Sequence, residues 1–189
     1  QCADDIYQDY GSAQDKAIVQ QNIAGLYLHL RRSDIAIKMY LEVIDRLLVL
    51  DDQLALAKAY GDLGLAYKSS GQLSKAKSYL YKSLDFFIEQ NSPYNIASQL
   101  NNIAEMYNQL KQFDKAIIYA KKSIALSKNQ QHKNAYVGSL YSLAKALFSQ
   151  GNYQQSLQNL SLSHQKSVEI DDFQQINKNL ALFSLIYAV

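Results

Sequence analysis

The chain has 189 residues, of which 48% are hydrophobic, and a formal net charge of +2 at pH 7. This hydrophobic content is enough for a packed core, no run of about 18 apolar residues predicts a membrane span, and the small net charge argues against direct binding of nucleic acid. Cys2 is the only cysteine, which excludes an intrachain disulfide and a thiolate metal cluster.

The sequence predicts helices throughout and no strands. Residues 1–12 come first, and the helical spacing of Ile6, Tyr7 and Tyr10 favours the remains of a helix over a loose arm. The helices that follow are predicted, in chain order, at 13–30, 34–50, 52–70, 73–90, 93–110, 113–129, 133–150, 153–169 and 173–188.

A repeat of 40 residues carries this assignment. Its anchor column is Tyr27, Tyr67, Tyr107, Leu147 and Tyr187. Mostly apolar residues stand seven and four positions before each anchor, so they share one face of an amphipathic helix. Small residues alone stand three positions before it and nine positions after it: Ala24, Gly64, Ala104, Ala144 and Ser184, then Ala36, Ala76, Ala116 and Ser156. A fixed period of this length is typical of an array whose units bury their apolar faces by stacking.

Turn residues recur with the same period and divide each unit into two helices. Gly71 and Gly151 stand at matching positions, where a helix can end in a left-handed cap. Ser92 followed by Pro93 is typical of an N-cap with proline at the first helical position. The turns between units are predicted at Asp51–Asp52, Asn91–Ser92, Gln131–His132 and Asp171–Asp172.

Gly64, Tyr67, Gly71 and Ala76, in the segment YGDLGLAYKSSGQLSKAKSYLYKSL, resemble the tetratricopeptide repeat. The resemblance covers residues 20–189 and implies an all-α fold, a right-handed superhelical α-solenoid of antiparallel helix pairs. We expect one such solenoid over residues 1–189, with units at 17–53, 57–93, 97–133 and 137–173 and a partial or capping helix at 174–189.

The chain departs from the family pattern in three ways. Its period is 40 residues rather than about 34, no unit carries the early tryptophan, and the proline that often closes a unit is absent. Longer repeats of this kind are similar to those of bacterial peptide-sensing regulators, kinesin light chains and polarity scaffolds.

Charge is distributed unevenly along the chain. Residues 111–145 contain seven lysines and one acidic residue, whereas residues 1–62 contain ten acidic and six basic residues. Two interpretations of the lysine-rich segment stay open: a solvated outer face, or a basic patch for an acidic partner.

The sequence shows no catalytic motif, and we expect neither enzyme activity nor a cofactor or metal. It has no nucleophile elbow, no phosphate-binding glycine loop and no His-Glu-x-x-His. The three histidines fall in different units and at different repeat positions: His29, His132 and His164.

The family resemblance places function on the inner wall, which is lined by the first helix of each unit. The wall positions give the candidate binding groove: Gln21, Lys58, Lys68, Asn101, Glu105, Asn108, Tyr141, Lys145 and Phe148. The amides of Asn101 and Asn108 would bond the backbone of an extended peptide. Tyr141 and Phe148 would either supply an apolar anchor for a ligand or pack against the next helix.

Some family members clamp a chaperone's C-terminal carboxylate with lysine, arginine and asparagine side chains. The corresponding positions here hold other residues: Gln21, Gly25, Gly61, Ser98 and Asn102. Binding of a chaperone tail is therefore not expected.

Two functions of different class follow. The first is a module that binds a protein or peptide partner through the concave groove. The alternative is the sensory or regulatory input domain of a larger bacterial signalling protein, whose nucleotide cyclase, kinase or DNA-binding output lies outside this chain. Because the chain begins with Gln1 and stops two residues after Tyr187, we expect a processed or trimmed piece of a cytoplasmic or periplasmic protein.

Overall fold

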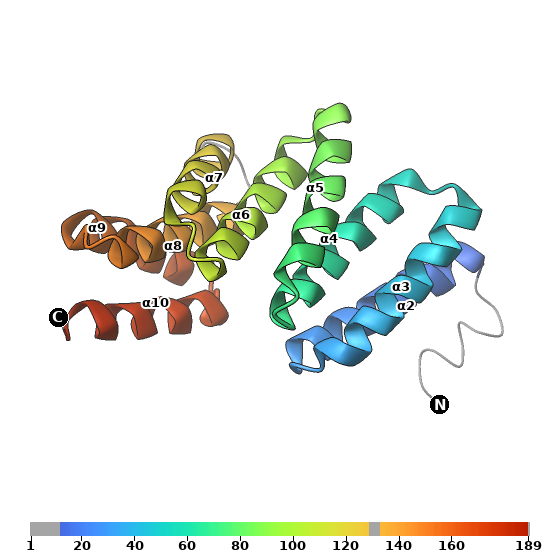
Figure 1. The fold of residues 1–189 in the computed structure, drawn as a ribbon, viewed down its shortest axis with the longest axis horizontal. Helices are drawn as coiled ribbons and strands as arrows, with labels where there is room; N and C mark the ends of the chain where they lie inside the picture. The colour runs from blue at the N-terminus through green and yellow to red at the C-terminus, as the bar shows by residue number, and fades with distance from the viewer. Residues whose placement is uncertain (1–11, 129–132, 189) are drawn as a thin grey trace. The chain divides into compact units, whose positions relative to one another are not determined.

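The computed structural model describes residues 12–128 and 133–188. Within these residues it is entirely helical (Figure 1), with α2 (Ala13–His29), α3 (Ser33–Leu50), α4 (Gln53–Ser69), α5 (Leu73–Glu89), α6 (Pro93–Gln109), α7 (Phe113–Ser127), α8 (Lys133–Ser149), α9 (Tyr153–Glu169) and α10 (Phe173–Ile186). The predicted helices are confirmed, with every boundary within two residues. The helix remnant before residue 12 and the Gln131–His132 turn lie outside the described residues.

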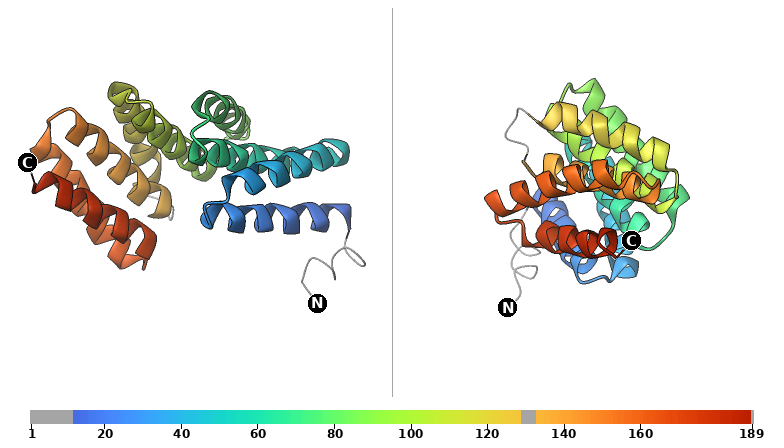
Figure 2. Two further views of the ribbon diagram at one scale, coloured as in Figure 1. Left: turned by 60° about the horizontal axis from the view of Figure 1, so that its bottom comes forward. Right: turned by 90° about the vertical axis from the view of Figure 1, so that its left-hand side faces the viewer.

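The chain forms two compact units, Gln1–Phe86 and Phe87–Val189. In the first unit α2 packs on α3, α3 packs on α4, and α2 also contacts α4. In the second unit (Figure 2) each helix from α6 to α9 packs on the helix that follows it. The first helices of successive repeats also meet, because α8 contacts both α6 and α10. Successive helices form antiparallel pairs (Figure 1), as predicted, and α10 follows the last pair. A single solenoid over residues 1–189 stays a prediction.

Left-handed residues end the helices at the repeat period. Between the two helices of each 40-residue repeat these are Arg31, Gly71, Lys111 and Gly151, with φ of 60°, 77°, 56° and 79°. The next N–H then donates to the anchor carbonyl, for example from Gln72 to Tyr67 at 2.9 Å. This is the bond of a Schellman motif, so the anchor column also closes the helix. The turns between successive repeats also use left-handed residues: Asp51, Asn91 and Asp171.

Replacing Lys111 by glycine is expected to raise the free energy of unfolding by roughly 0.5 to 1 kcal/mol. The left-handed conformation costs an L-residue about 1–2 kcal/mol, and glycine recovers this minus its own entropic cost. Urea denaturation followed by circular dichroism measures the change. The control is Lys121→Gly, at an exposed position in the middle of α7, which should lower the free energy of unfolding by about 1 kcal/mol. Equal effects of the two variants would contradict the left-handed conformation assigned to Lys111.

Helix N-termini are capped by acidic and hydroxyl side chains. Ser12 and Asp15 form a capping box on α2, and these hydrogen bonds hold the pKa of the Asp15 carboxyl below its ordinary value. Asp52 and Asp172 accept backbone N–H groups at the starts of α4 and α10. Ser92 is the N-cap of α6 with proline following, as predicted, but its hydroxyl accepts from the Asn95 side chain instead of a backbone N–H.

The small columns lie where helices approach most closely, as predicted, with one exception: Ser184 is exposed. Fully buried residues include Ala24, Ala36, Ala76, Ala104, Ala116, Ala144 and Ser156. The anchors Tyr67, Tyr107 and Leu147 are also buried. Tyr187 is different, because it is 76% exposed and stacks on Phe183, with ring centroids 6.3 Å apart. No described helix follows α10 to cover this face.

Candidate binding site

The nine predicted groove residues lie on first helices but differ in accessibility. Lys58 and Lys145 are exposed, whereas Lys68 and Asn108 are buried. The others are half-buried: Gln21, Asn101, Glu105, Tyr141 and Phe148. Three of the nine belong to the first unit and six to the second, and each set is described within its own unit.

The two asparagines of α6 connect this helix to α8. Asn108 is 6% exposed, and its Nδ2 donates to the Ser142 carbonyl at 2.8 Å. Asn101 Oδ1 accepts from the Ser142 hydroxyl at 3.1 Å. The Asn101 amide also fills the space beside Gly138, where an added Cβ would come within 2.9 Å of Nδ2. The amide of Asn108 is therefore committed to helix packing, and Asn101 keeps part of its surface exposed.

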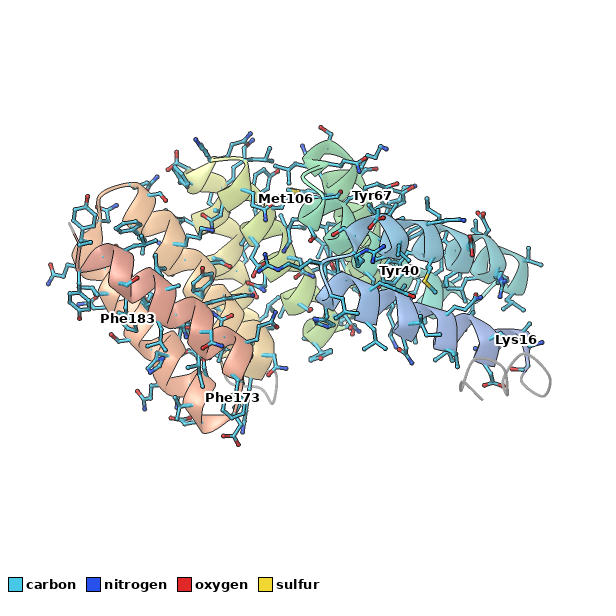
Figure 3. The ribbon with its side chains drawn as sticks, turned by 90° about the horizontal axis from the view of Figure 1, so that it is seen from below. Lys16, Tyr40, Tyr67, Met106, Phe173 and Phe183 are labelled. Atoms are coloured by element: carbon cyan, nitrogen blue, oxygen red, sulfur yellow. The ribbon has the colours of Figure 1, made fainter. Side chains whose placement is uncertain are left out.

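The two aromatic residues of α8 pack toward the last helices. Tyr141 and Phe148 contact the buried cluster that contains Leu160, Leu182 and Ile186. Burial raises the pKa of the Tyr141 hydroxyl, and the nearby Glu105 carboxylate raises it further. Of the two roles expected for these rings, the structure shows packing against the next helix. Figure 3 shows α10 with its labelled side chains Phe173 and Phe183.

Several lysines of the basic segment lie over tyrosine rings. Lys115 Nζ is 5.4 Å from the Tyr107 ring centre, and Lys122 Nζ is 5.7 Å from that of Tyr119. The same arrangement occurs 40 residues earlier, where Lys75 lies over Tyr67 at 5.1 Å. These contacts give part of the lysine-rich segment a packing role.

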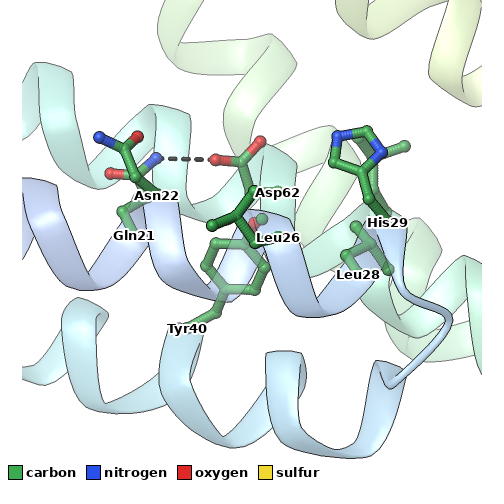
Figure 4. A pocket seen from close by; sticks show the side chains of 9 residues that line it. Gln21, Asn22, Leu26, Leu28, His29, Tyr40 and Asp62 are labelled. Carbon is green, nitrogen blue, oxygen red and sulfur yellow. Dashed lines mark hydrogen bonds between the residues drawn. The ribbon is translucent and has the colours of Figure 1, made fainter. Parts of the chain in front are cut away.

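An open pocket lies in the first unit between α2 and α4 (Figure 4). Its volume is about 500 Å³, and its lining residues are Gln21, Asn22, Gly25, Leu26, Leu28, His29, Tyr40, Asp62 and Leu65. Gly25 lies beside the Tyr40 hydroxyl, which a Cβ at Gly25 would meet at an ordinary contact distance of 3.5 Å. The pocket therefore combines an apolar wall with a few polar groups, as small-molecule and side-chain sites commonly do.

Asp62 is the acidic group of this pocket. Gln21 Nε2 donates to its Oδ2 at 2.7 Å. Burial raises the pKa of the Asp62 carboxyl, while the Gln21 hydrogen bond and the Lys58 charge partly offset this effect. Burial, with a contribution from Asp62, also raises the pKa of Tyr40. The hydrogen bond from Gln21 and the charge of Lys58 therefore offset only part of the cost of burying the charged Asp62 carboxylate.

Asp62 and Tyr40 were not among the predicted site residues. The predicted groove includes Lys58 and Lys68 of α4 but not Asp62, and Tyr40 belongs to a column of mostly apolar residues on the second helices. One signal was present in the sequence. The column that contains Asp62 is polar in all four units, with Asn22, Asn102 and Ser142 at the matching positions.

No group of three or more His, Cys, Asp or Glu side chains among the described residues is arranged to hold a metal ion. None of the described helices combines the length and apolarity needed to cross a bilayer.

Comparisons with known proteins agree with this architecture. Two family models described as tetratricopeptide repeat match residues 15–89 and 99–130, together more than half of the chain. An uncharacterized protein, ycf37 of Pyropia yezoensis, is 33% identical over 86 residues, which is 46% of this chain and 45% of that protein. The chain thus matches slightly less than half of this curated relative.

Solved structures share the fold at low sequence identity. A Rap protein complexed with competence and sporulation factor has a TM-score of 0.83 at 15% identity, covering 92% of this chain and 48% of that one. BtubC (BKLC) of P. vanneervenii has a TM-score of 0.71 at 15% identity, covering 87% and 68%. A putative kinesin light chain of nearly identical TPR-like repeats has a TM-score of 0.68 at 14% identity, covering 95% and 98%.

Proposed function

We propose, from the premise that this chain belongs to the tetratricopeptide repeat family, that it binds a segment of a partner protein along its first helices. Repeats of this family are typically interaction modules without catalytic groups. The observation that carries the proposal is the pocket between α2 and α4, because it is an open, mostly apolar site on the helices expected to face a ligand.

Exposed apolar surface on α2 supports the same site. Leu26 lines the pocket and is 62% exposed, so a ligand would remove a large apolar side chain from water. Ile18, two turns earlier on α2, is also exposed. Half-buried Gln21 lies between them along the helix and presents an amide at the pocket wall. Apolar contacts flanking a polar group are typical of surfaces that bind an extended segment.

Replacing Leu26 by serine is expected to weaken peptide binding about tenfold, or roughly 1.4 kcal/mol. The probe is the tightest peptide selected by the wild-type protein from a random library, and fluorescence anisotropy gives its dissociation constant. Folding should change little, because Leu26 is exposed. The matched control is Leu48→Ser, an exposed leucine on the second helix α3, which should alter affinity less than about twofold.

The two variants distinguish a ligand bound on the first helices from one bound on the second helices. Loss of affinity in Leu48→Ser with none in Leu26→Ser would place the ligand on the second helices and overturn the proposal. A wild-type protein that selects no peptide would overturn it as well.

A second candidate is the sensory part of a longer regulatory protein. The observation that favours it is that this chain matches 48% of a Rap protein solved with competence and sporulation factor. Sequencing the complete gene tests this candidate. An output domain encoded in the same reading frame would support it, and its absence would leave the interaction module alone.

A further inference from the structure

The pocket of the first unit is chemically one-sided. Its wall contains the apolar side chains of Leu26, Leu28 and Leu65, and its charged group is Asp62. The residues that line it include neither lysine nor arginine. A ligand group that enters it therefore meets apolar side chains and one carboxylate.

The carboxylate has one oxygen available for a ligand. Oδ2 accepts from Gln21 at 2.7 Å, whereas no hydrogen bond from the described residues to Oδ1 is present. Figure 4 shows the carboxylate between Gln21 on one side and His29 on the other, with Tyr40 below. Gln21 thus orients the carboxylate while leaving half of its acceptor capacity open.

Asp62 is half-buried, and the partial loss of water around its charge favours a cation. A carboxylate removed from water is stabilised when a positive group comes within hydrogen-bonding distance. Lys58 is the basic residue that acts on Asp62, and it is exposed on the same helix. The pocket itself contributes only His29 and Tyr40 as further titratable groups. The site is therefore complementary to a positively charged group with an apolar stem.

We propose that this pocket takes one lysine or arginine side chain of the bound segment. Its ammonium or guanidinium group would donate to Asp62 Oδ1, and its methylene stem would pack on Leu26, Leu28 and Leu65. Gln21 acts as a positioning residue for the carboxylate. The inference rests on the proposed function, since it names the side chain that the first-helix surface selects.

The test uses the wild-type chain and the peptides that it selects from a random library. A basic residue is expected at one fixed position of these peptides. Replacing that residue by citrulline or norleucine, which keep the stem and remove the charge, should weaken binding about ten- to hundredfold. In Asp62→Asn the same peptide replacement should change affinity less than about twofold, because the charged partner is gone.

Asp62→Asn is expected to fold, because asparagine already occupies the matching positions Asn22 and Asn102. The control is Asp45→Asn, which removes an exposed carboxylate from α3 and should keep the full penalty of the neutral peptide. Equal penalties in wild type and Asp62→Asn would overturn the inference.

A measurement on the wild-type protein alone gives an independent result. The pKa of Asp62, followed by the NMR shift of its carboxyl carbon, should fall when the basic peptide binds, because the cation favours the ionised form. Affinity should correspondingly decrease as the pH falls through the raised pKa of the free protein. A pKa unchanged by the peptide would contradict the inference.

The result distinguishes the two proposals. Peptides that bind with Leu26 dependence but without a preferred basic residue would overturn the role of Asp62 and keep the interaction function. Failure of the wild-type protein to select any peptide would overturn both.

Discussion

Replacing Gly64 by leucine is expected to lower the free energy of unfolding by about 3 kcal/mol. A Cβ at this position would lie 2.8 Å from Leu80 Cγ and Cδ2 and 3.1 Å from the Leu80 backbone nitrogen. Leu80 is fully buried on α5, so relief of the clash requires movement of α5 away from α4. Urea denaturation measures the loss, and amide hydrogen exchange in α4 and α5 shows whether it is local.

Gly25→Ala is the matched control for Gly64, because both glycines lie within first helices. A Cβ at Gly25 meets only the Tyr40 hydroxyl, at an ordinary distance of 3.5 Å. Alanine there should stabilise the helix by roughly 0.5 to 1 kcal/mol. If Gly64→Leu were as stable as the wild type, α4 and α5 would not be in the close contact that the small-residue column predicts.

The helix positions were predictable because several independent signals repeat at one period. Anchor residues, small columns and turn residues each recur every 40 residues, so an ambiguous segment is resolved by the others. The fifth unit shows where this reasoning ends. Tyr187 keeps the anchor position but is exposed, because burial depends on the helix that covers a residue and not on repeat position alone.

The left-handed turn residues were only partly predictable. Glycine favours positive φ, which identified Gly71 and Gly151. Arg31 and Lys111 have no such preference, yet the repeat geometry imposes the same conformation on them. Their positions in the repeat, rather than their side chains, contain the information.

The site was less predictable than the fold, because the repeat register assigns a residue to a helix face but not to a partner. Asn101 and Asn108 are on α6 as predicted, and their amides bond Ser142 on α8. Asp62 lies one position outside the expected wall, and its pocket includes Tyr40 from the neighbouring second helix. A pocket formed by two different helix columns cannot be deduced from either column alone.

Replacing Asn179 by alanine is expected to lower the free energy of unfolding of the second unit by about 3 kcal/mol. Asn179 is fully buried on α10, and its Oδ1 accepts from Gln175 Nε2 at 3.1 Å. Its Nδ2 donates to Ser167 Oγ at 3.2 Å, and its Oδ1 also lies 3.1 Å from Ser163 Oγ. Alanine would leave the buried Gln175 amide without this acceptor and would create a cavity. Chemical denaturation measures the change.

Two further variants separate the hydrogen-bond contribution from the lost volume. Asn177→Ala, at an exposed position of α10, should change stability by less than about 0.5 kcal/mol. Asn179→Ser introduces the residue found 40 positions earlier, where Ser139 Oγ donates to Ser123 Oγ at 2.7 Å. Because serine adds an oxygen but little volume to alanine, it should recover about 1 kcal/mol if unsatisfied polar groups cause the loss. Equal stability of Asn179→Ser and Asn179→Ala would assign the loss to the cavity, and the buried polar contacts between α9 and α10 would then contribute little to stability.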